Sequence, residues 1–258
     1  MIKKIAFLCL TLLIGTKAFA AKQDPTEVII DRPDAWHFSV TPYLWSAGNN
    51  GYFDIFVTRA NFSVPAFNWH DLDFGGGLDF EARKEKWSLL LDPSFVKLTQ
   101  IQYVNNARAK ASLGISSIDA GAYYQVLPTI NILESERTTS LELMGAFRIM
   151  GFHSVIDYYS PTLRNKSDTT NIITPVLGAR IKYNPSINFQ TWLNADFGGF
   201  KIDRVASTWS AMAGIKYYFT KNWGATLAYK ALGVHYYKRA YTINTIVHGP
   251  LLGITYYI

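Results

Sequence analysis

The chain ends on the stretch Pro250-Leu251-Leu252-Gly253-Ile254-Thr255-Tyr256-Tyr257-Ile258, which has the alternation of a β-strand. Successive side chains of a strand point to opposite faces. Chain ends usually fray into water, so an apolar face that runs to the last residue indicates a strand that is paired and surrounded by apolar material. That face carries Pro250, Leu252, Ile254, Tyr256 and Ile258.

This ending resembles the C-terminal insertion signal of outer-membrane β-barrel proteins. Gly253, Tyr256 and Ile258 stand at its glycine, hydrophobic and terminal positions. Two positions depart from the signal, because the usual last residue is Phe and a polar residue is common where Leu251 stands. The resemblance implies insertion by the barrel-assembly machinery into the outer membrane of a Gram-negative cell, in contact with lipid and lipopolysaccharide.

The other end of the chain has the pattern of a secretory signal peptide. Lys3 and Lys4 precede an apolar run over residues 5–15, and Ala18-Phe19-Ala20 is a small-x-small cleavage site. The apolar run is shorter than the roughly 18 residues that a membrane-spanning helix needs. We therefore expect a signal peptide over 1–20, a periplasmic leader over 21–35 and an outer-membrane barrel over 36–258.

Composition excludes several classes of protein. Cleavage removes the single Cys of the 258 residues, so a mature chain of 258 − 20 = 238 residues has no disulfide. The net charge of +6 includes three lysines of the signal peptide, and the remaining +3 is too weak and dispersed for nucleic-acid binding. Aromatic residues at 15% and charged residues at 17% suit a barrel with an apolar band and aromatic girdles. We interpret the tyrosine pairs 123–124, 217–218, 236–237 and 256–257 as girdle residues.

From Trp36 onward, alternating segments follow one another with no helical periodicity between them. We expect about twelve strands in an all-β, transmembrane, antiparallel up-and-down barrel, or ten if residues 52–67 fold as a loop. Residues 48–51, rich in Gly and Asn, are predicted to form a turn. Bulges are predicted at Pro93 and near Ser116-Ser117, where the alternation slips.

The lengths of the connections predict how the barrel is oriented. Periplasmic turns are short in such barrels and extracellular loops are longer. With the C-terminus in the periplasm, the short turns at 84–86, 184–186 and 220–222 lie there too. The longer segments near 101–110, 157–169 and 238–246 are then expected outside.

Two motifs carry a further resemblance. Thr41-Pro42-Tyr43-Leu44-Trp45 and Phe80-Glu81-Ala82-Arg83 are similar to segments of a group of mostly uncharacterised Gram-negative outer-membrane β-barrel proteins, clearest over residues 36–98. The resemblance implies an outer-membrane barrel and brings no catalytic residue. No cofactor is expected.

The ionisable residues of the strands gather on the face opposite the apolar one, which predicts that they point into the barrel. Unpaired charges away from water are costly, so one interpretation is a charge network that holds the barrel together. The other is a constriction that filters small solutes. The set is Asp79, Glu81, Arg83, Asp92, Glu142, Arg148, Arg180, Lys182, Asp196, Lys216 and Lys230.

Three functions stay open on these residues. We expect a narrow, porin-like passage of weak ion selectivity, because the inward charges nearly balance. A plugged structural or interaction barrel is the alternative. A lipid-processing enzyme at the outer rim is the third, with His70-Asp71 and His153-Ser154 near that rim. Adjacent residues of a strand point to opposite faces, however, so His153 and Ser154 cannot form a catalytic pair, and no histidine has metal-ligand spacing.

Overall fold

The computed structural model describes residues 35–56, 58–66, 75–131, 138–160, 162–202, 205–238 and 241–258. The expected signal peptide and nearly all of the leader lie outside these residues, as does the His70-Asp71 pair. No helix in the described part of the chain is long and apolar enough to cross a membrane.

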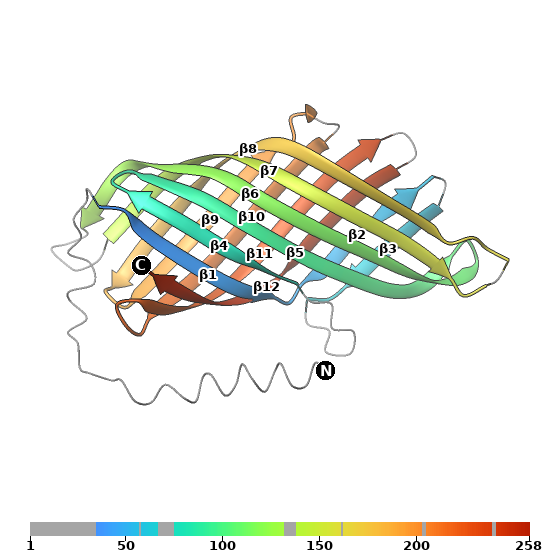
Figure 1. The fold of residues 1–258 in the computed structure, drawn as a ribbon, viewed down its shortest axis with the longest axis horizontal. Coiled ribbons are helices and arrows are strands. Elements are labelled where there is room, and N and C mark those ends of the chain that lie inside the picture. Colours follow the sequence, from blue (N-terminus) through green and yellow to red (C-terminus); the bar gives the residue numbers. More distant parts are fainter. Residues whose placement is uncertain are drawn as a thin grey trace.

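Twelve antiparallel strands form one sheet that closes into a barrel (Figure 1). The expectation of an all-β, up-and-down transmembrane barrel is therefore confirmed. The strands are β1 (His37–Trp45), β2 (Gly48–Ile55), β3 (Thr58–Val64), β4 (Gly75–Lys84), β5 (Trp87–Val104), β6 (Ala107–Asn131), β7 (Thr138–Tyr158), β8 (Lys166–Ser186), β9 (Phe189–Gly198), β10 (Val205–Tyr218), β11 (Trp223–Lys238) and β12 (Tyr241–Tyr257).

The C-terminal strand closes the barrel, as its sequence predicts. One edge of β12 pairs with β11, and the other pairs with β1 over residues 251–257 and with β2 over residues 241–248. β1 and β2 therefore share one strand position, and β3 and β4 share the next because they pair with β2 and β1. Twelve strands thus fill 12 − 2 = 10 positions around the circumference. Residues 48–55 and 58–64 are strands, so the ten-strand alternative, in which residues 52–67 fold as a loop, is wrong.

Several predicted connections are strands in the structure. Residues 48–51 pair with β12 inside β2, so the predicted turn there is wrong; Gly51, at φ 153°, packs where an added Cβ would meet Thr245. The predicted loop at 101–110 is also wrong. There β5 and β6 stay paired up to a two-residue turn, in which Asn105 and Asn106 take φ of 49° and 62°, a backbone conformation that Asn tolerates.

The outer surface has an apolar band around the end of the barrel that holds the C-terminus. On β7 it covers the outward residues of 141–149, and on β12 those of 250–258; Leu143 and Leu252 are 51% and 60% exposed. Each range is close to the roughly 9–11 residues of a tilted transmembrane strand. Tilted aromatic pairs edge the band, with ring centroids 4.7–4.9 Å apart: Trp87–Tyr124, Phe189–Tyr217 and Trp223–Tyr256.

The polarity of the two faces exchanges at one level along the strands. On β6, the outward residues are apolar over 118–126, and the inward residues over 117–125 include Asp119 and Gln125. Closer to the β5–β6 turn the pattern reverses: Lys110 and Ser112 point outward, while Leu113 and Ile115 are buried inside. The end that holds the C-terminus, called the membrane end below, is therefore apolar outside and polar within. At the other, distal end, the interior is apolar and the exterior of β6 is polar.

The exchange of polarity explains why the sequence at Ser116-Ser117 predicts a bulge that the structure does not contain. β6 keeps one continuous register with β5 from Ala107 to Tyr124 and with β7 from Ala109 to Gln125. The apolar residues change face at this level because their apolar surroundings change from lipid outside to protein inside. The register is likewise the same on both sides of Pro93, so the bulge predicted there is absent too.

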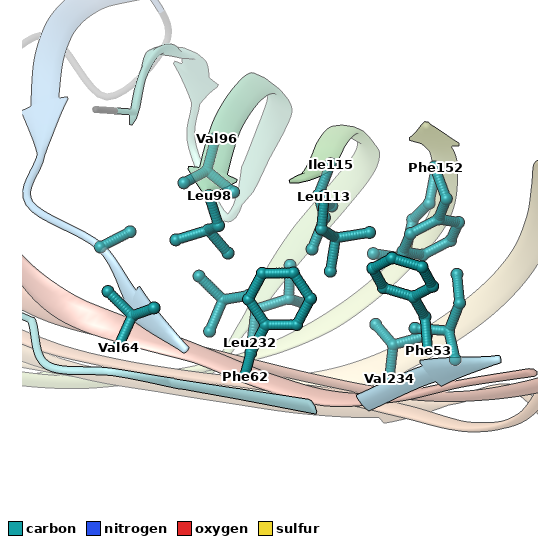
Figure 2. Close-up of a cluster of buried hydrophobic side chains, with 14 of the residues drawn as sticks. Phe53, Phe62, Val64, Val96, Leu98, Leu113, Ile115, Phe152, Leu232 and Val234 are labelled. Carbon is teal, nitrogen blue, oxygen red and sulfur yellow. The ribbon is translucent and has the colours of Figure 1, made fainter. Parts of the chain in front are cut away.

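A packed hydrophobic core fills the distal end (Figure 2). Among the described residues, β4 pairs with β5 only as far as Val96, and β9 pairs with β8 only from Val176 onward. Beyond these points, β5–β8 form one wall and β11, β12, β2 and β3 form the other, packed as two sheets face to face. Fully buried members from both walls include Leu98, Leu113, Phe152, Phe53 and Ile243.

Candidate functional site

The interior of the membrane end holds three groups of ion pairs, each with side chains from strands that are not neighbours. The first centres on Glu142 of β7, which is fully buried. Arg180 of β8 donates to Glu142 at 2.6 Å and, with both amino groups, to Glu81 of β4 at 2.8 and 3.0 Å. Lys182 lies 3.3 and 3.4 Å from the same two carboxylates, and Arg83 pairs with Glu142. Because β4 and β8 lie on opposite walls, this group bridges the lumen.

The second group centres on Arg148, whose side chain is fully buried. Its guanidinium donates to both oxygens of Asp119 on β6 at 2.8 Å and reaches Asp196 on β9 at 3.0 Å. Thr208 accepts a further hydrogen bond at 3.3 Å, and Ser210 donates to Asp196 at 2.5 Å. Buried charges are tolerated when an arginine binds a carboxylate through two hydrogen bonds and the remaining donors and acceptors of both groups also have partners.

The third group joins β11 to β5 across the barrel. The Lys230 ammonium lies 2.9 Å from Asp92, and the Tyr43 hydroxyl donates to the same carboxylate at 2.7 Å. Gly77 of β4 makes room for this tyrosine, because a Cβ on that residue would overlap the Tyr43 ring and hydroxyl. The glycine is therefore required by close packing inside the barrel.

A cavity of about 450 Å³ lies below these groups, at the end that holds the C-terminus. Its mouth is lined by residues of the strand ends, such as His37, Asn222 and Ile258, and its inner end reaches Asp119 and Lys230. The hydrophobic core begins beyond the ion pairs. The lumen is thus a pocket that is open toward one end of the barrel.

The structure places all eleven predicted ionisable residues inside the barrel. Nine of them take part in the ion pairs described above, while Asp79 and Lys216 line the cavity and have no ion pair among the described residues. Sequence reasoning missed Asp119. The alternation that puts Ile118 and Ala120 outside puts Asp119 inside, so the signal was present.

The tyrosine pairs are split between the two faces, which corrects their prediction as girdle residues. Tyr124 and Tyr256 lie in the girdle, but Tyr123 is buried inside with the Arg180 guanidinium 3.8 Å from its ring centroid. Tyr257 points inward and accepts a hydrogen bond from Lys216 at 3.0 Å. Neighbouring residues of a strand cannot both face lipid. The inward members are Tyr123, Tyr218, Tyr236 and Tyr257.

His153 and Ser154 point to opposite faces, as the strand geometry requires. His153 is exposed and its Nδ1 lies 2.9 Å from the Thr169 hydroxyl, whereas the buried Ser154 hydroxyl lies 2.7 Å from that of Tyr241. Among the described residues, no group of His, Cys, Asp and Glu is placed to hold a metal ion.

The fold and interior define a transmembrane β-barrel with an ion-paired lumen at one end and a hydrophobic core inside the other. No family model and no curated protein matches the sequence. Among solved structures, the outer-membrane protease OmpT of Escherichia coli is similar, with a TM-score of 0.58 at 10% identity over 88% of this chain and 98% of that one. Ail of Yersinia pestis gives a TM-score of 0.41 at 10% identity, covering 86% and 99%. Neisserial surface protein A gives 0.40 at 12% identity, covering 85% and 96%. The likeness to OmpT shows a shared barrel fold.

Proposed function

We propose that this protein is a sealed outer-membrane barrel with a structural or binding role, and that it does not conduct solutes. The observation that carries the proposal is the hydrophobic core across the distal end. Leu98, Leu113 and Phe53 come from both walls and are completely inaccessible to solvent. A solute in the lumen would meet packed apolar side chains, which offer no hydrogen-bonding groups in place of water.

The outer-membrane location is supported by independent features of the chain. The apolar band has the height of a membrane-spanning strand, and aromatic pairs edge it. The ending at Gly253, Tyr256 and Ile258 is part of the strand that closes the barrel, where an insertion signal has to act. In this location the end with the C-terminus faces the periplasm and the distal end faces outward.

The ion pairs form a second obstacle below the core. Arg180 joins opposite walls through Glu81, and Lys230 does so through Asp92. Both are direct side-chain contacts across the lumen, so the charges bind one another and leave no ring of free charge around a channel. This arrangement supports the structural interpretation of the inward charges over a selectivity filter.

Conductance of the purified, folded protein in planar bilayers tests the proposal. We expect silent bilayers under conditions in which a general porin, added as the control, gives discrete steps. Folding is verified on the same sample by heat-modifiable migration in SDS gels. Discrete steps that change when Arg148 and Arg180 are neutralised together would reject the sealed barrel and restore the narrow passage.

A further inference from the structure

The ion pairs inside the barrel leave one acid and one base over. Among the eleven predicted residues and Asp119, acidic and basic side chains are equal in number, and all of them except Asp79 and Lys216 have an ion-pair partner. Asp79 of β4 has neither a hydrogen bond nor an ion pair among the described residues. Lys216 of β10 has a hydrogen bond to the Tyr257 hydroxyl but no carboxylate within ion-pair distance in that part of the chain.

These two residues face the same cavity from opposite walls. β4 and β10 are separated by β1, β12 and β11 along the ladder of ten strand positions. Both Asp79 and Lys216 line the cavity of about 450 Å³. The ammonium of Lys216 is held in place, because it lies 5.8 Å from the Trp192 ring and 5.4 Å from the Tyr257 ring.

A third unpaired group lines the same cavity. Asn194 donates from its amide nitrogen to the Tyr123 hydroxyl at 3.1 Å, and its oxygen, which is shielded from solvent, has no hydrogen-bond partner among the described residues. Buried polar atoms in folded proteins nearly always have a partner. Because this oxygen is shielded from water, the accessible charges that make the cavity a polar binding site are the Asp79 anion and the Lys216 cation.

We propose that this cavity binds a small zwitterion from the end that holds the C-terminus. An ammonium group of the ligand pairs with Asp79, and an anionic group pairs with Lys216. Two kinds of molecule have this chemistry, namely a free amino acid or short peptide and the phosphoethanolamine headgroup of a lipid. The proposal does not depend on whether the barrel conducts, since the cavity lies on the near side of the ion pairs.

Calorimetric titration of the detergent-folded protein tests the site with three probes: glycylglycine, glycerophosphoethanolamine and the uncharged N-acetylglycinamide. We expect at least one zwitterion to bind and the uncharged amide not to bind. Asp79→Asn and Lys216→Gln should each weaken binding about tenfold or more, because each removes a charge-assisted hydrogen bond. Neither change breaks an ion pair of the folded barrel, so both variants should still fold, and heat-modifiable migration checks this.

Lys97→Gln is the matched control, because Lys97 is exposed on the outer face of β5 and should leave binding unchanged. Preference for glycylglycine assigns the site to amino acids or peptides, and preference for glycerophosphoethanolamine assigns it to a headgroup. Failure of both zwitterions to bind, equal binding of the uncharged amide, or unchanged affinity in both variants would overturn the proposal. A conducting barrel would leave these expectations as they are, so the two proposals fail separately.

Discussion

At the scale of single residues, Arg148 shows most clearly how the barrel tolerates charge inside a membrane. Its side chain is fully buried, and its guanidinium holds two carboxylates from two different strands. Each charge of the group is compensated only while the other members remain. Removal of one partner leaves an unpaired buried charge, which costs more than the pair itself contributes.

Arg148→Met should therefore destabilise the folded barrel by about 3–5 kcal/mol. Asp119 and Asp196, whose side chains are only 15% and 2% exposed, would lose their common partner. The measurement is the urea midpoint for unfolding of the detergent-folded protein, followed by tryptophan fluorescence.

Arg59→Ala is the matched control for this change. Arg59 also makes a two-point contact with a carboxylate, Asp54, at 2.8 and 2.9 Å, but its side chain is 54% exposed. Exposed ion pairs contribute little, so its midpoint should hardly move. Equal effects of the two changes would contradict the structural role of the buried group.

The direction in which each charged residue points could be predicted from the sequence, but its partner could not. Alternation alone put Arg180 and Glu81 inside. That they meet depends on the tilt and stagger of strands that are nearly half a barrel apart, which no local pattern encodes. The same limit explains why Tyr43 escaped notice as a partner of Asp92. No local pattern distinguishes this tyrosine of the first strand from the others, because its contact with β5 forms only in the closed barrel.

At the scale of elements, β12 combines two environments in one strand. Its outward residues over 250–258 lie in the apolar band, and those over 242–248 are mixed, with Thr242 and Asn244 among them. The Ile258 amide donates to the Phe38 carbonyl at 2.9 Å and so completes the seam with β1. The cost of a new charge on the outer face of this strand should therefore depend strongly on its position.

Leu252→Lys should cost about 2–4 kcal/mol and reduce insertion, whereas Thr242→Lys should cost about 0–1 kcal/mol. Both changes put the same ammonium group on the outside of β12. Only the first puts it against lipid. Folding yields in vesicles of defined composition, read from heat-modifiable migration, give the comparison. Similar yields for the two variants would contradict the assigned band.

The elements also show where sequence reasoning failed. Twelve alternating segments were recognisable because a strand needs only a repeat of two. Residues 48–51 looked like a turn because Gly and Asn are turn residues, yet here Gly51 is required by close approach to Thr245. The interruption of the alternation in β6 looked like a bulge. A bulge and a change of apolar surroundings from lipid to the barrel interior both move the apolar residues to the other face of the strand. Only the registers with β5 and β7 separate them.

At the scale of the whole molecule, the two ends of the barrel are surrounded by different media. The apolar band, the aromatic pairs and the cavity belong to the end with the C-terminus. The distal end has an exterior of mixed polarity around a hydrophobic core formed by two facing walls of strands. The orientation proposed above puts that end outside the cell.

Thiol labelling in intact cells tests this orientation, because the only native Cys is Cys9. A membrane-impermeant maleimide should label Lys110→Cys, which is exposed on the outer face near the β5–β6 turn. Lys86→Cys, in the turn at the other end, should react only after the outer membrane is permeabilised. Leu143→Cys should resist the reagent in both conditions, and the unmodified protein gives the background. Labelling of residue 86 but not of residue 110 in intact cells would reverse the orientation.

The exchange of polarity along the strands also restricts how far one strand can slip in register relative to its neighbours. In a barrel whose strands alternate uniformly, a one-residue slip exposes the wrong face, but a two-residue slip keeps every side chain on its own face. Here a two-residue slip of β6 would carry Leu113 and Ile115 away from the core level or bring Asp119 up against it. The polarity pattern therefore fixes the position of each strand along the barrel axis as well as the face to which each side chain points. An insertion or deletion of two residues within β6 should be as harmful to this protein as one of a single residue.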